Sequence, residues 1–217
     1  MILFDESHEQ FCTVSGKKKR KPYTQLAEKA GNMQSCLHRD DFLRLLPKSD
    51  TLVLAEPHVY FSRREVEGIL GFVEKGGGLL LIGNHSNTPR YYTFGCNEVL
   101  NPIATLFGMR FNDDEIFFNG ANTIQDFIPH KIFEGISSVF FWRGCSLSLT
   151  KNEDSCIAAF ARMGHSRVYS ARPAVMCLGG NKVFAVGDSS VWSNPRAGLE
   201  GDGLHLGYNV LRWCGKT

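Results

Sequence analysis

The sequence predicts an α/β protein with a mainly parallel sheet and antiparallel additions in its second half. Two apolar runs, residues 53–55 and 79–82, each end abruptly in polar residues and flank one amphipathic segment. Strands that are apolar at every position are typical of a parallel sheet covered on both faces. The second half contains several short strand-like segments instead of a strand–helix alternation. That change predicts antiparallel strands added to a parallel core.

The segment between the two apolar runs has the pattern of a helix. Ser62 and Glu65 have the spacing of a capping box, which marks a helix start. Apolar residues then recur every three or four positions, at Val66, Ile69, Leu70 and Val73. This spacing gives the helix one apolar face that packs on the sheet. Residues 76–78, all glycine, end the helix, so residues 51–82 form a β-α-β unit.

The other elements follow from apolar runs and from Gly and Pro positions. Before the unit we expect a strand over 2–4, a helix opened by Pro22 and ended by Gly31, a strand over 33–37 and helical turns over 41–46. After it we expect a helix over 97–107, an irregular excursion over 109–128 and a closing helix over 205–214. Five short strands lie between, over 139–142, 146–149, 156–161, 174–178 and 183–186, the last two joined by a hairpin at 179–181.

Length and composition predict one cytoplasmic domain spanning residues 1–217. The chain has 43% hydrophobic and 21% charged residues, which is ordinary for a soluble globular protein. No apolar stretch approaches the roughly 20 residues that cross a membrane, and the first residues do not resemble a signal peptide. The seven cysteines are scattered without a Cys-x-x-Cys pair. That pattern favours free thiols in a reducing compartment.

The positive charge is concentrated in one run. Residues 17–21 are all Lys or Arg, and without them 19 of the 24 basic residues remain against 22 acidic ones. The rest of the chain therefore has no basic excess with which to bind nucleic acid. We interpret the run from Lys17 to Lys21 as a solvated loop, with an anionic partner or a targeting signal as alternatives.

Five segments together resemble one protein superfamily: residues 2–8, 50–57, 72–83, 130–136 and 183–190. They are similar to the class I glutamine amidotransferase-like superfamily. The similarity is closest to its non-catalytic branches, the gliding-motility and intraflagellar-transport-type domains and the trehalose-utilisation-like proteins. This resemblance implies a flavodoxin-like three-layer sandwich.

The resemblance also identifies what this chain lacks. Catalytic members carry a Gly-x-Cys-x-Gly elbow after the strand that corresponds to residues 79–82, with a later His and Glu. Here residues 83–87 read Gly-Asn-His-Ser-Asn, and Asn84 is no nucleophile of that kind. Cys96 lies too far along the chain to replace the missing cysteine, and nothing in the sequence places it at a helix start. Glutamine amidotransferase activity is therefore not expected.

Polar residues gather where the predicted strands end. In parallel α/β sheets, ligands bind just beyond the carboxyl ends of the strands. Carboxylates there accept hydrogen bonds from hydroxyls, and amide and hydroxyl side chains both donate and accept. We expect non-catalytic binding of a small polar ligand, such as a carbohydrate, or of a protein partner, without a cofactor. The candidate residues are Asp5, His8, Glu56, Asn84, His85, Ser86, Arg143, Asp188 and Ser189.

A hydrolase using the same crevice is the alternative. His8, His58 and His85, with Asp5 or Glu56, are adequate ligands for a divalent metal that activates water. They lack a compact His-x-x-x-His spacing.

Metal-free hydrolysis would use Ser86 with His85, or Ser7 with His8. No Gly-x-Ser-x-Gly elbow supports either pair.

The same residues also have structural interpretations. Asp5 and Asp188 can cap a helix or accept backbone donors, and Asn84 and His85 can stabilise a turn. Arg143 can pair with an anionic ligand or with a strand-end carboxylate such as Glu56, or form a structural ion pair. The sequence does not decide among these roles.

Overall fold

The computed structural model describes residues 1–16, 21–85, 94–117, 123–150, 154–161, 172–194 and 201–215. Its helices are α1 (Thr24–Ala30), α2 (Arg39–Leu45), α3 (Arg63–Glu74), α4 (Cys96–Ala104) and α6 (Gly203–Cys214). The strands of the main sheet are β1 (Ile2–Asp5), β4 (Met33–Cys36), β5 (Thr51–Ala55), β6 (Gly78–Ile82), β10 (Asp126–Phe127), β14 (Cys156–Phe160), β15 (Ala174–Gly179) and β16 (Val183–Val186). Shorter strands are β2 (Cys12–Thr13), β3 (Lys21–Pro22), β7 (Met109–Phe111), β8 (Ile116–Phe117), β9 (Thr123–Ile124), β11 (Val139–Phe140), β12 (Arg143–Gly144) and β13 (Leu147–Leu149).

The main sheet confirms the predicted fold class. Its strand order is β10-β14-β15-β16-β6-β5-β1-β4. Strands β16, β6, β5, β1 and β4 pair in parallel, and β10, β14 and β15 are added in antiparallel orientation at one side. The first half of the chain thus supplies most of the parallel core, and the second half supplies the antiparallel strands.

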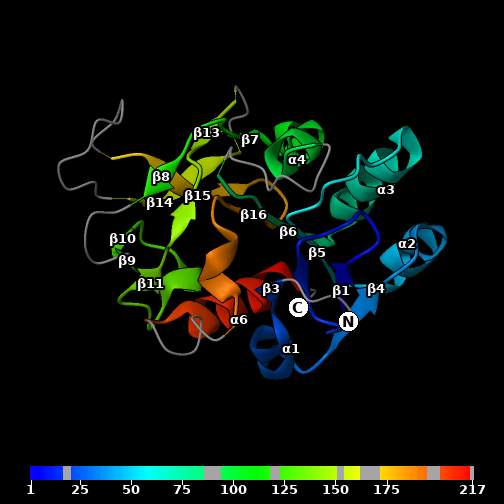
Figure 1. Ribbon diagram of the computed structural model, residues 1–217, viewed down its shortest axis with the longest axis horizontal. Helices are drawn as coiled ribbons and strands as arrows, with labels where there is room; N and C mark the ends of the chain where they lie inside the picture. Colours follow the sequence, from blue (N-terminus) through cyan, green and yellow to red (C-terminus); the bar gives the residue numbers. More distant parts are fainter. Residues whose placement is uncertain are drawn as a thin grey trace.

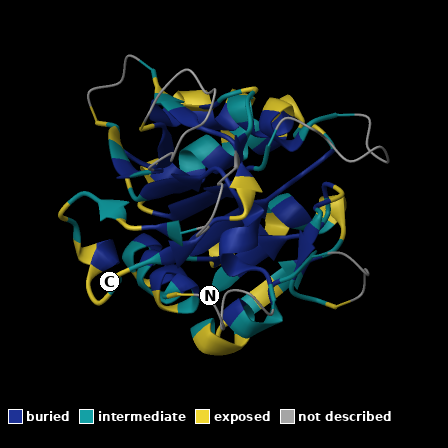
Figure 2. Cartoon of the chain, turned by 60° about the vertical axis from the view of Figure 1, so that its left-hand side comes forward, coloured by how far each residue is buried: buried dark blue, intermediate teal, exposed yellow. Residues whose placement is uncertain are grey.

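Two apolar cores lie on opposite faces of this sheet and make three layers. Val53 and Ala55 of β5 face the core that includes Leu26 of α1 and Val210 of α6. Leu52 and Leu54 face the other core, to which α2, α3 and α4 contribute. Figure 1 shows α1 and α6 on one side of the sheet and α2, α3 and α4 on the other. Figure 2 shows the central strands as the most buried part of the chain. Burial on both faces explains the continuous apolar runs in the sequence.

Local signals in the sequence set the ends of two elements as predicted. Ser62 accepts a hydrogen bond from the Glu65 amide, and the Glu65 carboxylate accepts one from the Ser62 amide, so the capping box begins α3. The hairpin between β15 and β16 turns at Asn181 and Lys182, whose φ angles are 59° and 64°. Asparagine tolerates this left-handed region better than most residues.

Three segments differ from the sequence-based expectation. Pro22 lies in β3 and not in a helix, because the next residue, Tyr23, donates its amide to the Thr13 carbonyl at 2.8 Å and continues the strand pairing. The excursion over 109–128 contains the short strands β7 to β10, which pair with distant segments and so leave no local periodicity. The expected strand over 139–142 is shorter, because β11 ends at Phe140 and β12 begins at Arg143.

Among the described helices, none combines the length and the apolar character that crossing a bilayer requires.

Candidate functional site

The predicted strand-end residues lie at the carboxyl ends of β1, β5, β6 and β16. Asp5 ends β1, Glu56 follows β5, Asn84 lies two residues after β6, and Asp188 follows β16 by two residues. Glu56 has a φ of 54°, an uncommon value for a residue with a side chain. Two backbone hydrogen bonds of 2.9 Å hold it there: the Glu56 amide donates to the Ile82 carbonyl, and the Glu56 carbonyl accepts from the Phe11 amide. The backbone therefore turns at Glu56, directly after β5.

Asn84 connects two of these strand ends. Its side-chain amide donates to Glu56 Oε1 at 2.8 Å and to Ser189 Oγ at 3.2 Å. Glu56 and Ser189 are both buried, and Asn84 is half-buried. The turn after β6 therefore carries an amide that joins three strand ends.

Lys21 also contacts Ser189, the residue that Asn84 bonds. Its ammonium donates to Ser189 Oγ at 2.9 Å and to Ser190 Oγ at 2.8 Å. The sequence analysis placed Lys21 in a solvated loop, and the structure corrects this for Lys21, because β3 carries it to the strand ends. Residues 17–20 of the basic run lie outside the described residues. We call Lys21, Glu56, Asn84, Ser189 and Ser190 the Asn84 network.

Asp188 is buried beside the Asn84 network and accepts backbone donors. Its carboxylate accepts the Ser190 amide at 2.7 Å and the Trp142 amide at 2.6 Å. Burial raises the pKa of Asp188, although Lys21 and the hydrogen bonds work in the opposite direction. These contacts match the helix-capping interpretation, since Asp188 is the N-cap of the 3₁₀ turn that begins at Ser189.

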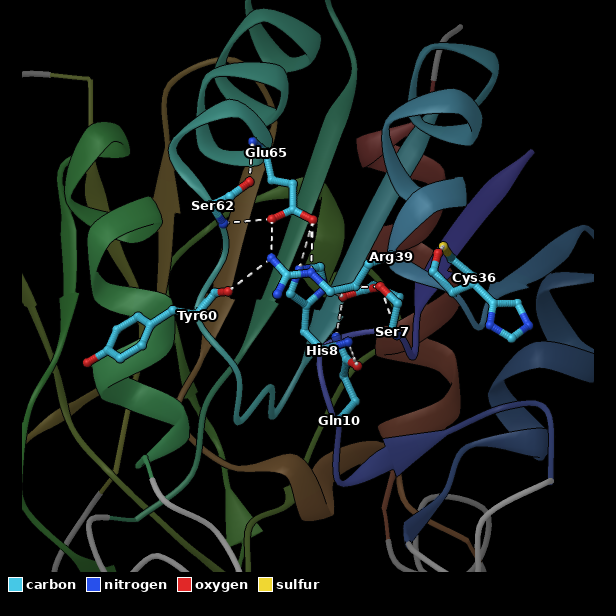
Figure 3. Close-up of polar contacts among 10 residues, drawn as sticks. Ser7, His8, Gln10, Cys36, Arg39, Tyr60, Ser62 and Glu65 are labelled. Carbon is cyan, nitrogen blue, oxygen red and sulfur yellow. Dashed lines mark hydrogen bonds and ion pairs between the residues drawn. The ribbon is translucent and has the colours of Figure 1, made fainter.

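Asp5 and His8 belong to a second group, of which Figure 3 labels Ser7, His8, Gln10 and Glu65. His8 Nδ1 lies 2.7 Å from Asp5 Oδ2, and Gln10 also donates to that oxygen. His8 Nε2 lies 3.3 Å from Glu65 Oε1, within ion-pair distance but without hydrogen-bond geometry. Ser7 donates its hydroxyl to Asp5 Oδ1 at 2.6 Å. We call Asp5, Ser7, His8, Gln10 and Glu65 the His8 network.

The His8 network reaches the surface through Arg39. Arg39 lies 2.5 Å from Glu65 Oε2 and is partly exposed. Burial raises the pKa of Glu65, but hydrogen bonds from Arg39 and Ser62 outweigh it and bring that pKa to about 2. Phe61 stacks on the His8 ring at a centroid distance of 3.9 Å. The network therefore fixes the loop after β1 against the start of α3.

The described residues of the hydrolase alternatives have the following contacts. Ser7 Oγ lies 2.6 Å from Asp5 Oδ1 and 3.1 Å from His8 Nδ1, and His8 Nδ1 also lies 2.7 Å from Asp5 Oδ2. His58 points Nδ1 at the Phe94 carbonyl, 2.9 Å away. Ser86 lies outside the described residues. Within the described ranges, no three His, Cys, Asp or Glu residues are grouped so that they could hold a metal ion.

His85 lies near enough to Arg143 to feel its charge. Burial lowers the pKa of His85, and the positive charge of Arg143 lowers it further. The His85 ring is therefore neutral near pH 7, and its buried Nδ1 atom has no hydrogen-bond partner among the described residues. Arg143 pairs with Glu115, not with Glu56. Among the proposed roles of Arg143, this contact matches the structural ion pair.

Next to His85 a pocket of about 380 Å³ opens at the first turn of α4, which we call the α4 pocket. The helix starts at Cys96 because Gly95, in extended conformation, is its N-cap. Cys96 therefore does lie at a helix start, contrary to the expectation from the sequence. The pocket is lined by His85, Gly95, Cys96, Asn97, Glu98, Asn101, Arg110, Phe111 and Asp113.

Cys96 does not have the properties of a nucleophile. Burial, and next the charge of Glu56, raise its pKa well above that of an ordinary thiol. The same two effects raise the pKa of Cys12, whose thiol lies 3.5 Å from Glu56 Oε2. Because the thiolate is the reactive form, both thiols remain unreactive near neutral pH.

Sequence reasoning missed Lys21 and most of the α4 pocket. Gly95 before the polar Asn97 is a recognisable helix start, so Cys96 could have been placed correctly. Asn97 is also buried, and it exchanges hydrogen bonds with the Asn84 backbone at 2.6 and 3.1 Å. Arg110 and Asp113 come from the excursion and carried no local signal. The pocket therefore combines one predicted site residue, His85, with residues that only the fold brings near it.

Comparisons with known proteins identify the fold. No family model matches the sequence, and no curated protein is significantly similar to it. Among solved structures, the mmIFT52 N-terminal domain is similar with a TM-score of 0.77 and 14% identity, over 100% of this chain and 98% of that one. A ThuA-like protein from Bacteroides uniformis gives a TM-score of 0.60 and 12% identity, over 98% of this chain and 90% of that one. An alpha-L-fucosidase isoenzyme from Paenibacillus thiaminolyticus gives a TM-score of 0.57 and 10% identity, over 99% of this chain and 33% of that one.

These identities are low enough that the likeness concerns the fold alone. At that level it confirms the fold that the resemblance implied: this chain has the α/β fold seen in the mmIFT52 N-terminal domain and in the ThuA-like protein.

Proposed function

We propose that this chain is a non-catalytic domain that binds a small polar ligand, such as a carbohydrate, in the α4 pocket. The observation that carries this proposal is the contrast at the strand ends. The side chains of the Asn84 network bond to one another, whereas the neighbouring α4 pocket is open and is lined by the exposed side chains of Glu98 and Arg110. A volume of about 380 Å³ lies within the range of small-molecule sites.

The lining of the pocket suits a ligand with several hydroxyl groups. Glu98 and Asp113 supply acceptors, and Arg110 supplies donors. The neutral His85 ring also lines the pocket. Hydroxyl groups match such a mixture because each hydroxyl both donates and accepts.

The described thiol and hydroxyl groups near the strand ends favour binding over hydrolysis. Among the described residues, the thiol lining the pocket is Cys96, whose pKa is raised. The Ser7 hydroxyl lies 2.6 Å from Asp5 Oδ1 and 3.1 Å from His8 Nδ1, and His8 Nδ1 also lies 2.7 Å from Asp5 Oδ2, so Asp5 holds both groups within the His8 network. These contacts favour a domain that has kept the crevice of its fold without the chemistry.

A ligand screen tests the proposal. Thermal unfolding of the purified chain is followed with neutral monosaccharides and disaccharides, polyols, amino acids, nucleotides and divalent ions. Fucosides are included because this fold forms part of an alpha-L-fucosidase. A ligand at about one hundred times its Kd stabilises the folded state by roughly 2.7 kcal/mol. We expect a hydroxyl-rich ligand to raise Tm in the presence of a chelator.

Variants connect the result to the pocket. Arg110→Ala should remove the Tm shift, and Arg63→Ala, which removes the same charge from the exposed side of α3, should keep it. A shift that survives Arg110→Ala would place the ligand elsewhere. Turnover of the ligand, detected by NMR, would replace the binding proposal with the hydrolase. No response to any sugar or polyol would contradict the ligand class.

A further inference from the structure

A groove lies between α2 and α3, and Figure 1 shows both helices on the side of the sheet away from α6. It consists of two adjoining hollows that share Leu43, and we call it the α2–α3 groove. The first has a volume of about 350 Å³ and is lined by Leu43, Leu46, Pro47, Glu67, Gly68, Gly71, Phe72 and Lys75. The second has a volume of about 570 Å³ and is lined by Arg39, Asp40, Leu43, Arg44, Ser62, Arg64 and Glu65. The groove is thus apolar toward the end of α3 and polar toward its start.

Two glycines of α3 form part of the apolar hollow, and only one of them is explained by packing. A Cβ added at Gly68 would lie 2.7 Å from Leu43 Cδ2, so the approach of α2 requires a glycine there. A Cβ added at Gly71 would meet no atom within 4 Å. Glycine inside a helix destabilises it by about 0.5–1 kcal/mol relative to alanine. Gly71 therefore weakens α3 without serving any contact within the described chain, and it leaves the floor of the groove open to close approach.

The charged residues around the groove indicate the charge of a partner that could bind there. Most of them form ion pairs within the chain. Arg39 pairs with Glu65, and Arg44 pairs with Asp41. Glu67 pairs with Arg63.

Arg64 and Lys75, one at each end, form no ion pair with the described residues. Asp40 at the polar end also has none, so the groove has an uncompensated charge of about +1. Arg64 and Lys75 are eleven residues apart on α3, which corresponds to about 16 Å at 1.5 Å per residue.

We propose that the α2–α3 groove binds an acidic amphipathic helix of a partner protein. The partner helix lies along α3 and carries two carboxylates that face Arg64 and Lys75. At 1.5 Å per residue, these carboxylates are about eleven residues apart. Apolar side chains at i, i+3, i+4 and i+7 enter the hollow over Gly71, which is the usual helix-in-groove arrangement. This surface is separate from the α4 pocket, so the inference does not depend on the proposed function.

A helical-peptide display library provides the probe, since the partner is unidentified. The library is selected on the folded wild-type chain, and the enriched peptides are measured by fluorescence anisotropy. We expect enriched sequences to carry acidic residues three turns apart with leucine or phenylalanine between them. Their affinity should fall at least about tenfold with Gly71→Leu, which fills the groove, a loss equivalent to about 1.4 kcal/mol. Arg64→Glu should weaken them less, and Arg212→Glu, an exposed position of α6 on the other side of the sheet, should leave them unchanged.

Folding controls keep the test decisive. Gly71→Ala and Gly71→Leu put good helix formers into α3, so both variants should be at least as thermally stable as the wild type. Loss of binding in a variant with raised Tm cannot come from unfolding. Enrichment of basic peptides, or of peptides that Gly71→Leu does not affect, would overturn the proposal. A wild-type dimer in sedimentation that Gly71→Leu dissociates would replace the partner helix with a second copy of the chain.

Discussion

The Asn84 network and the α4 pocket lie side by side and use similar residue types in opposite ways. In the network, Glu56, Asn84 and Ser189 are bonded to one another and to Lys21. In the pocket, the side chains of Glu98 and Arg110 are exposed. Polar groups that satisfy one another stabilise the fold, and polar groups left with free capacity can bind a ligand. Position at a strand end therefore does not by itself identify a binding residue.

Internal contacts account for the polar residues of the Asn84 network. Asn84, in the turn after β6, holds the ends of β5, β6 and β16 together. Lys21 places a positive charge beside the buried Glu56 and Asp188 carboxylates, whose burial without a counter-charge would be costly. These polar residues at the strand ends therefore have partners within the chain.

Removing Glu56 should have the largest effect on stability. Glu56→Ala takes an acceptor from the Asn84 amide in a buried setting, and we expect the free energy of unfolding to fall by about 2–3 kcal/mol. For Glu56→Gly, the free energy of unfolding should fall by about 1 kcal/mol less than for Glu56→Ala. Glycine adopts a φ near 54° without the penalty that a side chain carries. Urea unfolding monitored by circular dichroism measures both values.

Glu98→Ala in the α4 pocket is the matched control, with little expected loss of stability. If Glu56→Ala were as stable as the wild type, Glu56 would belong with the ligand-binding residues. The distinction between network and pocket would then fail.

Glu65 gives an effect of intermediate size that depends on pH. Its pKa of about 2 in the folded chain lies below the ordinary 4.5, so the folded state binds fewer protons than the unfolded state in this range. Its contribution is fully present above about pH 4.5 and is lost as the pH falls toward 2. After a reduction for the partly exposed Arg39, we expect about 1–2 kcal/mol.

The measurement is the free energy of unfolding between pH 5 and pH 2. Glu65→Gln should flatten this acid limb, whereas Asp41→Asn, in the exposed pair with Arg44, should leave it nearly unchanged. An unchanged limb in Glu65→Gln would show that the His8 network does not depend on the Glu65 charge.

Much of the fold could be predicted from the sequence because burial on both faces leaves a strong signal. The runs at β5 and β6 are apolar at every position, and the capping box begins α3 at Ser62. Strands β8 to β12 are two residues long and are set by long-range pairing, so no periodicity reveals them. Strands that end in polar residues also gave the positions of Asp5, Glu56, Asn84 and Asp188.

Neither the position of Lys21 nor the α4 pocket could be predicted in the same way. Lys21 belongs to a run of like charges, and such runs are usually solvated, so its contact with Ser189 has no local signal. Arg110 and Asp113 reach the pocket through β7, whose partner β13 lies more than thirty residues away. Sequence patterns report burial and turns, whereas free hydrogen-bonding capacity depends on which neighbours the complete fold supplies.

The smallest stability effect is expected for Arg110, and this makes it the sharpest test of the comparison. Arg110 alternates with the buried Met109 and Phe111 on β7, so its side chain faces outward while the strand is held by its neighbours. Arg110→Ala should change the free energy of unfolding by less than about 0.5 kcal/mol, as is usual for surface substitutions. The same variant should lose ligand binding, because it removes the donor group of the α4 pocket. Calorimetric titration with the ligand from the thermal screen, beside urea unfolding of the same sample, measures both properties. A variant that unfolds more easily and still binds would make Arg110 a structural residue, and the α4 pocket would then be no more open to function than the Asn84 network.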